Sequence, residues 1–195
     1  MKKIISLFQR NYDGDRLVRN EVVPGAEWVI AGEGIATRKF DGTCCMIRDG
    51  RLFKRCEVKG GNAPPPNFES AGSVDEVTGK LQGWVPVGDG PEDRWHREAF
   101  EAIPPNAHHT INMATFELVG PKIQGNPEKY ACHTLVNHRN YEKLKLYPEP
   151  PRDFDGIKAY LSAHDIEGIV FHHSDGRMVK IKGKDFGLKR NRQGS

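Results

Sequence analysis

The fold is decided by the stretch Thr43–Val58, which reads TCCMIRDGRLFKRCEV. Its centre, Asp49-Gly50, is a residue pair that type I′ turns prefer, because both turn positions need a positive φ angle. The segments on either side, Thr43–Arg48 and Arg51–Val58, contain the β-branched and aromatic residues that are typical of strands. The stretch therefore predicts an antiparallel hairpin with a two-residue turn.

Other segments of the chain repeat this strand pattern. Thr110–Val119 reads as a strand. Ile169–His172 and Met178–Ile181 predict a second hairpin around Ser174-Asp175-Gly176. Strands that are joined by hairpins pair antiparallel, so these segments predict antiparallel sheets rather than a doubly wound parallel sheet.

Two further segments predict helices that flank these sheets. Glu92–Ala102 follows Pro91, a residue suited to the first turn of a helix. Asp153–Ala163 is the second, and its apolar residues are spaced to form one face: Phe154, Ile157 and Leu161. The predicted fold class is therefore α+β, with antiparallel sheets and flanking helices.

The length of the chain, 195 residues, fits one globular domain, and no internal repeat is visible. We expect a single domain over residues 1–195. Its most irregular part is residues 60–91, where proline and glycine recur and predict a long loop. Loops of this length in compact domains are either functional lids or disordered segments.

The charge and the cysteines restrict the class of protein. The formal net charge of +3 permits nucleic-acid binding without requiring it, because a local basic cluster matters more than the total. The four cysteines include no Cys-x-x-Cys pair, which favours reduced, mostly buried thiols in a cytoplasmic protein over a catalytic or redox thiol. No apolar run approaches the roughly 18 residues of a membrane span, so neither export nor membrane insertion is expected.

The most informative motif for chemistry is RKFDGT, residues 38–43. If this segment is extended, Lys39 and Asp41 project from the same face, and Gly42 allows another backbone or a ligand to approach closely. A lysine attacks only as the neutral amine, and its ordinary pKa is about 10.4. Nearby cations and desolvation lower the pKa of a lysine. Taken alone, the motif also fits a surface turn.

Three further motifs place charged residues at strand-like segments. FELVG, residues 116–120, ends one such segment, and EGIVF, residues 167–171, puts the carboxylate of Glu167 at the start of another. VKIK, residues 179–182, places Lys180 and Lys182 on one strand face and apolar residues on the other. A solvated basic face would explain the two lysines, and a phosphate between them would offset their mutual repulsion.

In this order the four motifs resemble motifs I, III, IV and V of the covalent nucleotidyltransferases, the superfamily of ATP-dependent RNA ligases, DNA ligases and mRNA capping enzymes. The resemblance implies the nucleotidyltransferase (adenylation) domain of ATP-dependent ligases. It implies that Lys39 accepts the nucleotide, that Glu117 contacts the ribose or organises metal-bound water, and that Glu167 binds the catalytic metal. It marks as catalytic Lys39, Asp41, Lys180 and Lys182, and as nucleotide-binding Lys39, Arg55, Phe116, Glu117, Lys180 and Lys182.

Within the superfamily, two stretches look like the compact 5′-to-3′ RNA ligases: Lys39–Cys45, and Gly83–Gly88 continuing into Trp95–Ala99. These ligases imply a reaction in three steps. ATP adenylates Lys39, the AMP moves to a 5′-phosphate end, and a 3′-hydroxyl then attacks that end to join the strand. The implied cofactors are ATP and Mg²⁺ or Mn²⁺, and the implied partner is RNA with 5′-phosphate and 3′-hydroxyl ends, as in RNA repair.

Two roles have several candidates. The basic residue for the incoming 5′-phosphate is Lys54, Arg55 or Lys59. We favour Arg55 because its forked guanidinium can grip two phosphate oxygens, although Lys54 points to the other strand face and the face that binds RNA cannot be read from the sequence. The ring that stacks on adenine is one of three: Phe116, Tyr130 or Tyr141.

The end of the chain and its histidines carry weaker signals. After Lys182 only 13 residues remain, so we expect no C-terminal OB-fold domain of the kind that DNA ligases and capping enzymes carry. The last basic residues could bind phosphate backbone or belong to a frayed tail. His133 and His138 have a spacing that zinc ligands use, but no Cys-x-x-Cys accompanies them, so surface, core or nucleotide-lining histidines are favoured.

Competing functions share parts of this pattern. The P-loop and Rossmann glycine motifs are absent, which argues against those modes of nucleotide binding. A DNA end-joining enzyme or another lysine nucleotidyltransferase would have the same four motifs. A non-catalytic RNA-binding module would be expected to have lost catalytic side chains that this chain retains.

Overall fold

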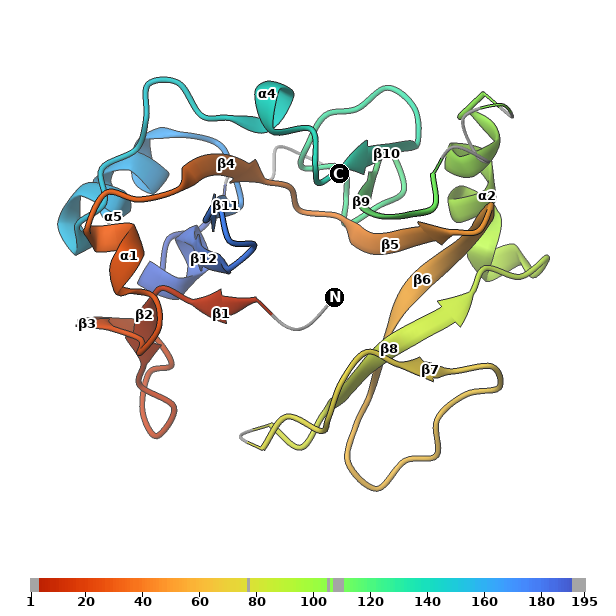
Figure 1. Cartoon of the computed structure of the whole chain (residues 1–195), viewed down its shortest axis with the longest axis horizontal. Helices are drawn as coiled ribbons and strands as arrows, with labels where there is room; N and C mark the ends of the chain where they lie inside the picture. Colours follow the sequence, from red (N-terminus) through yellow and green to blue (C-terminus); the bar gives the residue numbers. More distant parts are fainter. Residues whose placement is uncertain (1–3, 77, 105, 107–110, 191–195) are drawn as a thin grey trace. The chain divides into compact units, whose positions relative to one another are not determined.

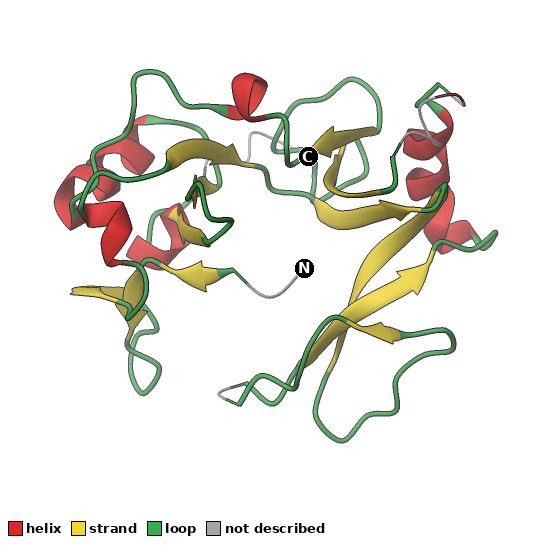
Figure 2. Ribbon diagram, viewed as in Figure 1, coloured by secondary structure: helices red, strands yellow, loops and turns green. Residues whose placement is uncertain are grey.

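The computed structural model describes residues 4–76, 78–104, 106 and 111–190, and Figures 1 and 2 show its helices and strands. The fold is α+β with antiparallel sheets and helices beside them, as predicted. Internal contacts divide the chain into two compact units. We call Asp41–Arg139 the central unit, and Ile4–Phe40 together with Asn140–Ser195 the terminal unit. Each is described by itself.

The central unit contains the predicted first hairpin. Strands β5 (Thr43–Arg48) and β6 (Arg51–Val58) have the predicted bounds, and their register is antiparallel. The turn residues Asp49 and Gly50 have φ angles of 50° and 71°, as a type I′ turn requires. This hairpin lies in the middle of a sheet whose described strands run in the order β10-β9-β5-β6-β8-β7, with antiparallel neighbours.

The outer strands of this sheet follow the predicted pattern less closely. The strand expected from Thr110 begins at Met113, as β9 (Met113–Val119), and residue 110 lies outside the described residues. The remaining strands are β7 (Glu69–Ser70), β8 (Leu81–Pro86) and β10 (Thr134–Asn137).

The prediction of one continuous loop over residues 60–91 is wrong, because β7 and β8 lie within it. The glycine in β8, Gly83, packs too closely for a side chain. A Cβ atom there would meet the ring of Phe68 at 2.3 Å and the carbonyl oxygen of Glu69 at 2.4 Å. Glycine therefore marks a close approach of two segments here rather than a flexible loop.

One face of the central sheet packs against a helix. A 3₁₀ turn, η1 (Pro91–Asp93), leads into α2 (Arg94–Glu101), close to the predicted helix, and Pro91 stands at its start. The core between sheet and helix is made of buried apolar side chains: Cys45, Ile47, Leu52, Ala99, Phe116 and Leu118. The opposite face of the sheet carries a smaller cluster of Met46, Phe53 and Trp84.

The terminal unit is built on a second sheet, with described strands in the order β1-β12-β11-β4. Its strands are β1 (Ile5–Ser6), β12 (Met178–Lys182), β11 (Gly168–His172) and β4 (Ile35–Lys39). The β11–β12 pair is the second predicted hairpin, and β1 pairs with β12 in parallel. A separate hairpin joins β2 (Phe8–Arg10) and β3 (Val18–Val22).

Helices and aromatic rings cover one face of this second sheet. The predicted helix is confirmed as α5 (Phe154–Ala163), and its N-cap, Asp153, accepts a hydrogen bond from the Gly156 amide at 2.8 Å. The shorter helices are α1 (Glu27–Ile30), α4 (Tyr141–Leu144) and η2 (Gly183–Phe186). The core on this face holds side chains from three strands and α5: Ala36, Ile157, Leu161, Ile169, Phe171, Val179 and Ile181. The other face of the sheet carries the side chains of Thr37, Lys39, Val170, Lys180 and Lys182.

Two expectations from composition can be compared with this structure. All four cysteines are free thiols; Cys45 is buried, Cys44 and Cys56 are partly buried, and Cys132 is exposed. Burial raises the pKa of the Cys45 thiol well above its ordinary value, so this group is inert. Within the described part of the chain, no helix combines the length and the apolar character needed to cross a membrane.

Candidate functional site

The register of the terminal sheet brings the lysines of two motifs together. Lys39 on β4 lies opposite Gly168 on β11, and Gly168 lies opposite Lys182 on β12. Two residues further along β11, Val170 lies between Thr37 and Lys180. Because side chains alternate along a strand, these positions share one face, which we call the lysine face: Thr37, Lys39, Gly168, Val170, Lys180 and Lys182. The predicted alternation of β12 is confirmed, since Val179 and Ile181 are fully buried on the other face.

Gly168 keeps the centre of this row clear. A Cβ atom at this position would lie 2.2 Å from the carbonyl oxygen of Ile181 and 2.9 Å from the Cα atom of Lys182. Both contacts are shorter than side chains tolerate, and both are with backbone atoms that cannot move aside. The glycine after Glu167 is therefore required by the close packing of β11 against β12.

Glu167 lies between the two lysines that flank Gly168. Its Oε2 atom accepts a hydrogen bond from Lys39 Nζ at 2.6 Å, and its Oε1 atom accepts one from Lys182 Nζ at 2.5 Å. The three side chains are mostly buried, with exposed fractions of 18% for each lysine and 13% for the glutamate. Lys39 also donates to the carbonyl oxygen of Phe40 at 3.2 Å. Two motif lysines thus share one carboxylate.

The charges around Glu167 decide its protonation state. Burial alone would raise the pKa of Glu167, but the ammonium groups of Lys39 and Lys182 outweigh burial and hold that pKa below its ordinary value. Glu167 is therefore an anion at neutral pH. A carboxylate in contact with Lys39 stabilises the charged ammonium form of the lysine.

The lysine with a clearly depressed pKa is Lys180. Burial, together with the nearby charges of Lys182 and Lys39, lowers its pKa from 10.5 to about 8. The sequence predicted such depression at Lys39, by neighbouring cations and desolvation. On the same face, Lys39 has the carboxylate of Glu167 as a partner. An anionic ligand on the lysine face would favour the charged form of Lys180.

The three candidates for the ring that stacks on adenine differ in burial and in the unit that contains them. Phe116 is 3% exposed in the core between the central sheet and α2, a position that does not favour it as the ring that stacks on adenine. Tyr130 lies in the loop after β9 of the same unit. Tyr141, on α4 of the terminal unit, is 40% exposed, and its ring contacts the ring of His172 on β11 at 4.9 Å between centroids. Of the three rings, Tyr141 is the one that lies in the unit of Lys39.

The turn after Lys39 differs from the prediction. Strand β4 ends at Lys39 and residues 41–42 form a bend, so Asp41 does not continue the alternation of that strand. The Asp41 amide donates to Glu128 Oε1 at 3.0 Å. The close approach predicted at Gly42 is confirmed, because a Cβ atom there would lie 2.2 Å from the carbonyl oxygen of Leu118 and 2.8 Å from Glu117 Cγ.

Glu117, on β9 of the central unit, is 8% exposed and has a histidine partner. The Nε2 atom of His138 lies 3.2 Å from Glu117 Oε2, and its Nδ1 atom lies 3.1 Å from Thr115 Oγ1. Sequence reasoning considered His138 only as one of several histidines. The signal that could have found it is the antiparallel pairing of β9 with β10, which places residue 138 next to residue 115.

The two basic residues of β6 have different surroundings. Lys54 points toward α2, where its Nζ atom lies 2.5 Å from Asp93 Oδ1, and Asp93 is 2% exposed. Arg55 lies on the opposite face, with its guanidinium 4.9 Å above the ring of Trp84 and its Nε atom donating to Gln82 Oε1 at 3.2 Å. Lys54 is thus engaged in an ion pair with a buried carboxylate, whereas the guanidinium of Arg55 lies on the other face of the strand.

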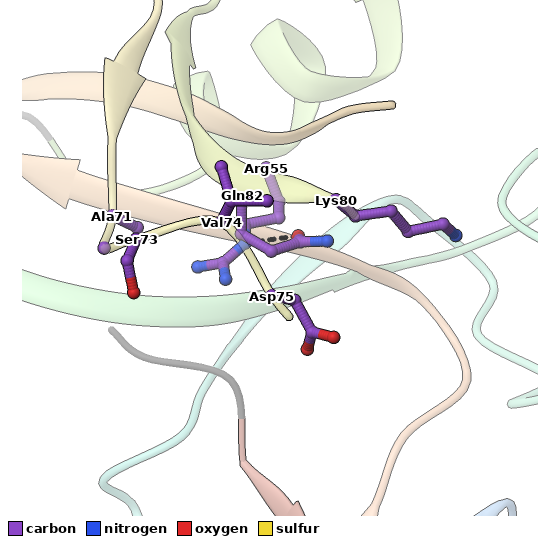
Figure 3. Close-up of a pocket in the computed structure, with 8 residues that line it drawn as sticks. Arg55, Ala71, Ser73, Val74, Asp75, Lys80 and Gln82 are labelled. Carbon is purple, nitrogen blue, oxygen red and sulfur yellow. Dashed lines mark hydrogen bonds between the residues drawn. The ribbon is translucent and has the colours of Figure 1, made fainter. Parts of the chain in front are cut away.

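Arg55 also lines a cavity of about 240 Å³ in the central unit. Figure 3 shows its guanidinium extending between the loop that follows β7 and the strand β8, with the hydrogen bond to Gln82 drawn. The charged residues that line the cavity are Arg55, Asp75 and Lys80. Since Lys80 is paired with Glu57 at 2.6 Å, the charges in and around the cavity nearly balance.

The residues of the lysine face fit a magnesium ion better than a zinc ion. Among the described residues, no three histidine, cysteine, aspartate or glutamate side chains gather as a metal cluster. His133 is a core residue, 5% exposed and stacked on Trp95 at 4.6 Å. Mg²⁺ typically uses one or two carboxylates and completes its shell with water and substrate phosphates. Glu167, one anionic carboxylate beside lysines that suit phosphate, matches that pattern.

Comparison with known proteins identifies the family. A family model described as RNA ligase 1 matches residues 97–194, which is 98 of the 195 residues. The chain belongs to the RNA ligase 1 family. It is 30% identical to RNA ligase 1 of Pongo abelii, over 79% of this chain and 67% of that protein. It is 28% identical to RNA ligase 1 of Danio rerio, over 62% of this chain and 45% of that protein, and 23% identical to RNA ligase 1 of Rattus norvegicus, over 79% and 67%.

The RNA ligase 1 match includes three of the four motifs. Glu117, Glu167 and both lysines of β12 lie within residues 97–194, whereas Lys39 precedes them. The resemblance to RNA ligases is thus confirmed at the level of the family. The roles of individual residues rest on their geometry and are proposals.

Proposed function

We propose that this member of the RNA ligase 1 family is an ATP-dependent RNA ligase that forms a lysyl-AMP intermediate at Lys39. The observation that carries the proposal is the pair of contacts from Lys39 and Lys182 to Glu167, on a sheet face that also holds Lys180. A nucleophilic lysine, a carboxylate for a metal ion and two phosphate-binding lysines are the groups that adenylation needs. Membership of an RNA ligase family supports RNA as the substrate.

The first proposed step joins Lys39 to AMP. The lone pair of Lys39 Nζ attacks the α-phosphorus of ATP, a nitrogen–phosphorus bond forms, and pyrophosphate leaves with the electrons of the broken oxygen–phosphorus bond. Lys180 and Lys182 stabilise the negative charge on the phosphate oxygens. Before this step the ammonium of Lys39 gives a proton to solvent, which becomes easier once Glu167 no longer stabilises the charged form.

Glu167 would hold Mg²⁺ or Mn²⁺, together with phosphate oxygens and water. Such an ion neutralises charge on phosphate groups and polarises the phosphorus for attack. For this chain, the consequence would be that Glu167 exchanges its contact with Lys39 for another. Were Glu167 to hold such an ion, Lys39 would lose the contact that stabilises its ammonium form.

The later proposed steps use the central unit as well. AMP moves from Lys39 to the 5′-phosphate of RNA, and a 3′-hydroxyl then attacks that phosphate and releases AMP. We propose Arg55 for the 5′-phosphate, because its guanidinium is planar and offers paired donors. We propose Glu117 for the ribose or for metal-bound water, Asp41 as part of the motif around Lys39, and Tyr141 for stacking on adenine. The free thiols suit a reducing compartment, so we place this activity in the cytoplasm, in RNA repair.

The experiment that tests the proposed function uses four substrates in parallel. Nicked and single-stranded forms of 5′-phosphorylated RNA and DNA are incubated with the protein, ATP and Mg²⁺, and sealed product is separated on a denaturing gel. The proposal predicts sealing of RNA, accumulation of adenylated 5′ ends when the 3′-hydroxyl is blocked, and no sealing without ATP. Better sealing of DNA than of RNA would contradict the proposal in favour of a DNA end-joining enzyme. A protein that binds RNA without sealing any substrate would be a non-catalytic module.

A further inference from the structure

His138 connects two polar side chains of β9. It follows directly after β10, and its backbone amide donates to the carbonyl oxygen of Thr115 at 3.1 Å. Its ring then spans two residues of the neighbouring strand, with Nδ1 at 3.1 Å from Thr115 Oγ1 and Nε2 at 3.2 Å from Glu117 Oε2. Thr115 and Glu117 share a strand face because they are two residues apart. The backbone contact and both ring contacts fix the orientation of the imidazole.

The hydrogen-bonding capacity of the three groups fixes the direction of each bond. An ionised carboxylate only accepts hydrogen bonds, so Nε2 of His138 must carry the proton that it donates to Glu117. In the neutral imidazole Nδ1 is then an acceptor, and the hydroxyl of Thr115 donates to it. The chain of bonds therefore runs from Thr115 through His138 to Glu117. The acceptor-only carboxylate of Glu117 thus selects the tautomer of His138, and the hydroxyl of Thr115, which can donate or accept, complements it.

The surroundings of Glu117 explain why a hydrogen-bond donor is needed to fix the orientation of its carboxylate. A Cβ atom at Gly42 would lie 2.8 Å from Glu117 Cγ, so Glu117 packs closely against the bend formed by residues 41–42. The side chain of Glu117 is 11% exposed, so water cannot fully solvate its charge, whereas His138 is 28% exposed at the edge of the sheet. A partly buried carboxylate with rotatable bonds keeps one orientation only when a donor holds it.

We propose that His138 is a positioning residue that holds the carboxylate of Glu117 in the orientation used during adenylation of Lys39. This inference rests on the proposed function, because it assigns Glu117 to that reaction. His138 acts through Glu117 and does not itself touch the reacting atoms. Losses of about 10- to 100-fold are typical when such a supporting hydrogen-bond partner is removed.

The test compares two substitutions of His138 in two backgrounds. His138→Gln keeps a donor that can reach Glu117, whereas His138→Phe keeps a ring and loses every donor. Each is made in the wild type and in Glu117→Ala, and the rate of lysine labelling by radiolabelled ATP is measured at saturating ATP. His164→Phe, which removes the ring contact to the Tyr160 carbonyl on α5, is the matched control. Thermal unfolding of every variant shows whether it is folded.

The proposal predicts that His138→Phe lowers the labelling rate about 10- to 100-fold, that His138→Gln retains most of it, and that neither matters in Glu117→Ala. Nitrogen NMR of the histidine rings should show the Nε2-protonated tautomer of His138 in the wild type. Equal losses in both backgrounds, a rescue by Phe rather than Gln, or the other tautomer would overturn the inference. If the wild type never becomes labelled, the proposed function fails; if it does and His138→Phe labels normally, this inference alone fails.

Discussion

The ammonium of Lys39 lies 2.6 Å from the carboxylate of Glu167, although the two residues are 128 positions apart in the chain. The contact joins the end of β4 to the residue before β11, and a second lysine, Lys182, binds the other oxygen of the same carboxylate. This arrangement stores Lys39 as an ammonium ion. In the proposed reaction, a ligand that engages Glu167 would free the amine of Lys39 from this contact.

Glu167→Gln should change how stability depends on pH. The lysines hold the pKa of Glu167 below its ordinary value of 4.5, so the folded state binds this proton less well than the unfolded chain. The stability that results is present above pH 4.5 and is lost as the pH falls through the folded-state pKa. We expect the variant to lose about 3 kcal/mol near neutral pH, the typical effect of breaking a buried ion pair, and to lose less on acidification than the wild type. Urea unfolding from pH 7 to pH 3 measures both; parallel pH curves would contradict the ion-pair account.

Lys180→Met should have the opposite effect on stability. The pKa of Lys180 is lowered from 10.5 to about 8, so the folded state gives up this proton before the unfolded chain does. The wild type should therefore gain stability from this group as the pH rises from 8 to 10.5. Near pH 7 the variant should be more stable by a few kcal/mol, since each unit of pKa shift is about 1.36 kcal/mol, and its advantage should shrink across that window. Lysine labelling should fall at least about tenfold, the effect of losing one preorganised phosphate donor. A variant less stable than the wild type at pH 7 would be the contrary result.

Gly168→Ala should disturb the pairing of β11 with β12, on which the lysine face depends. The added methyl group would meet backbone atoms of β12 at 2.2 Å and 2.9 Å, so the strands must separate. We expect a loss of about 1–3 kcal/mol in the free energy of unfolding, typical of overpacking, together with a loss of labelling. Gly183→Ala is the matched control, because the nearest atom to its Cβ would lie at 3.7 Å. Equal unfolding free energies for the two variants would show that the close approach at Gly168 is unimportant.

Arg55→Ala should mainly affect the transfer of AMP, whereas Lys54→Met should mainly affect stability. Arg55→Ala should slow the transfer of AMP to a 5′-phosphate more than it slows labelling of Lys39, because it removes a proposed phosphate donor. Lys54→Met leaves the buried carboxylate of Asp93 without its lysine and should lower stability by about 1–3 kcal/mol. Single-turnover transfer from protein that already carries AMP, with chemical unfolding of each variant, makes the comparison. If Lys54→Met is the variant that impairs transfer, the assignment of the two residues is reversed.

The sequence predicted local structure best where turn chemistry and alternation agree. Asp49-Gly50 and the alternating VKIK segment lead to a hairpin and a lysine face with the predicted bounds and orientation. The strand β8 was missed because Gly83 and Pro86 read as loop residues, although the glycine is there to admit a neighbouring segment. The burial of Phe116 was not predicted, because the sequence alone does not say which face of β9 packs against α2.

The candidate site was predicted as a set of residues and not as a geometry. Motif order named Lys39, Glu167 and Lys182, but their shared ion pairs depend on the register of three strands that come from distant parts of the chain. The same reason explains why His138 was not selected. Its partner Glu117 lies 21 positions earlier, and only the pairing of β9 with β10 brings them together.

The central claim is that Lys39 becomes covalently bound to AMP. The most direct measurement is intact mass spectrometry of the protein after incubation with ATP and Mg²⁺, followed by peptide mapping at neutral or alkaline pH. The account predicts a single added AMP residue, located on Lys39, absent from Lys39→Arg and removed by excess pyrophosphate. A wild-type protein that gains no mass, or that carries the nucleotide on another residue, would contradict it.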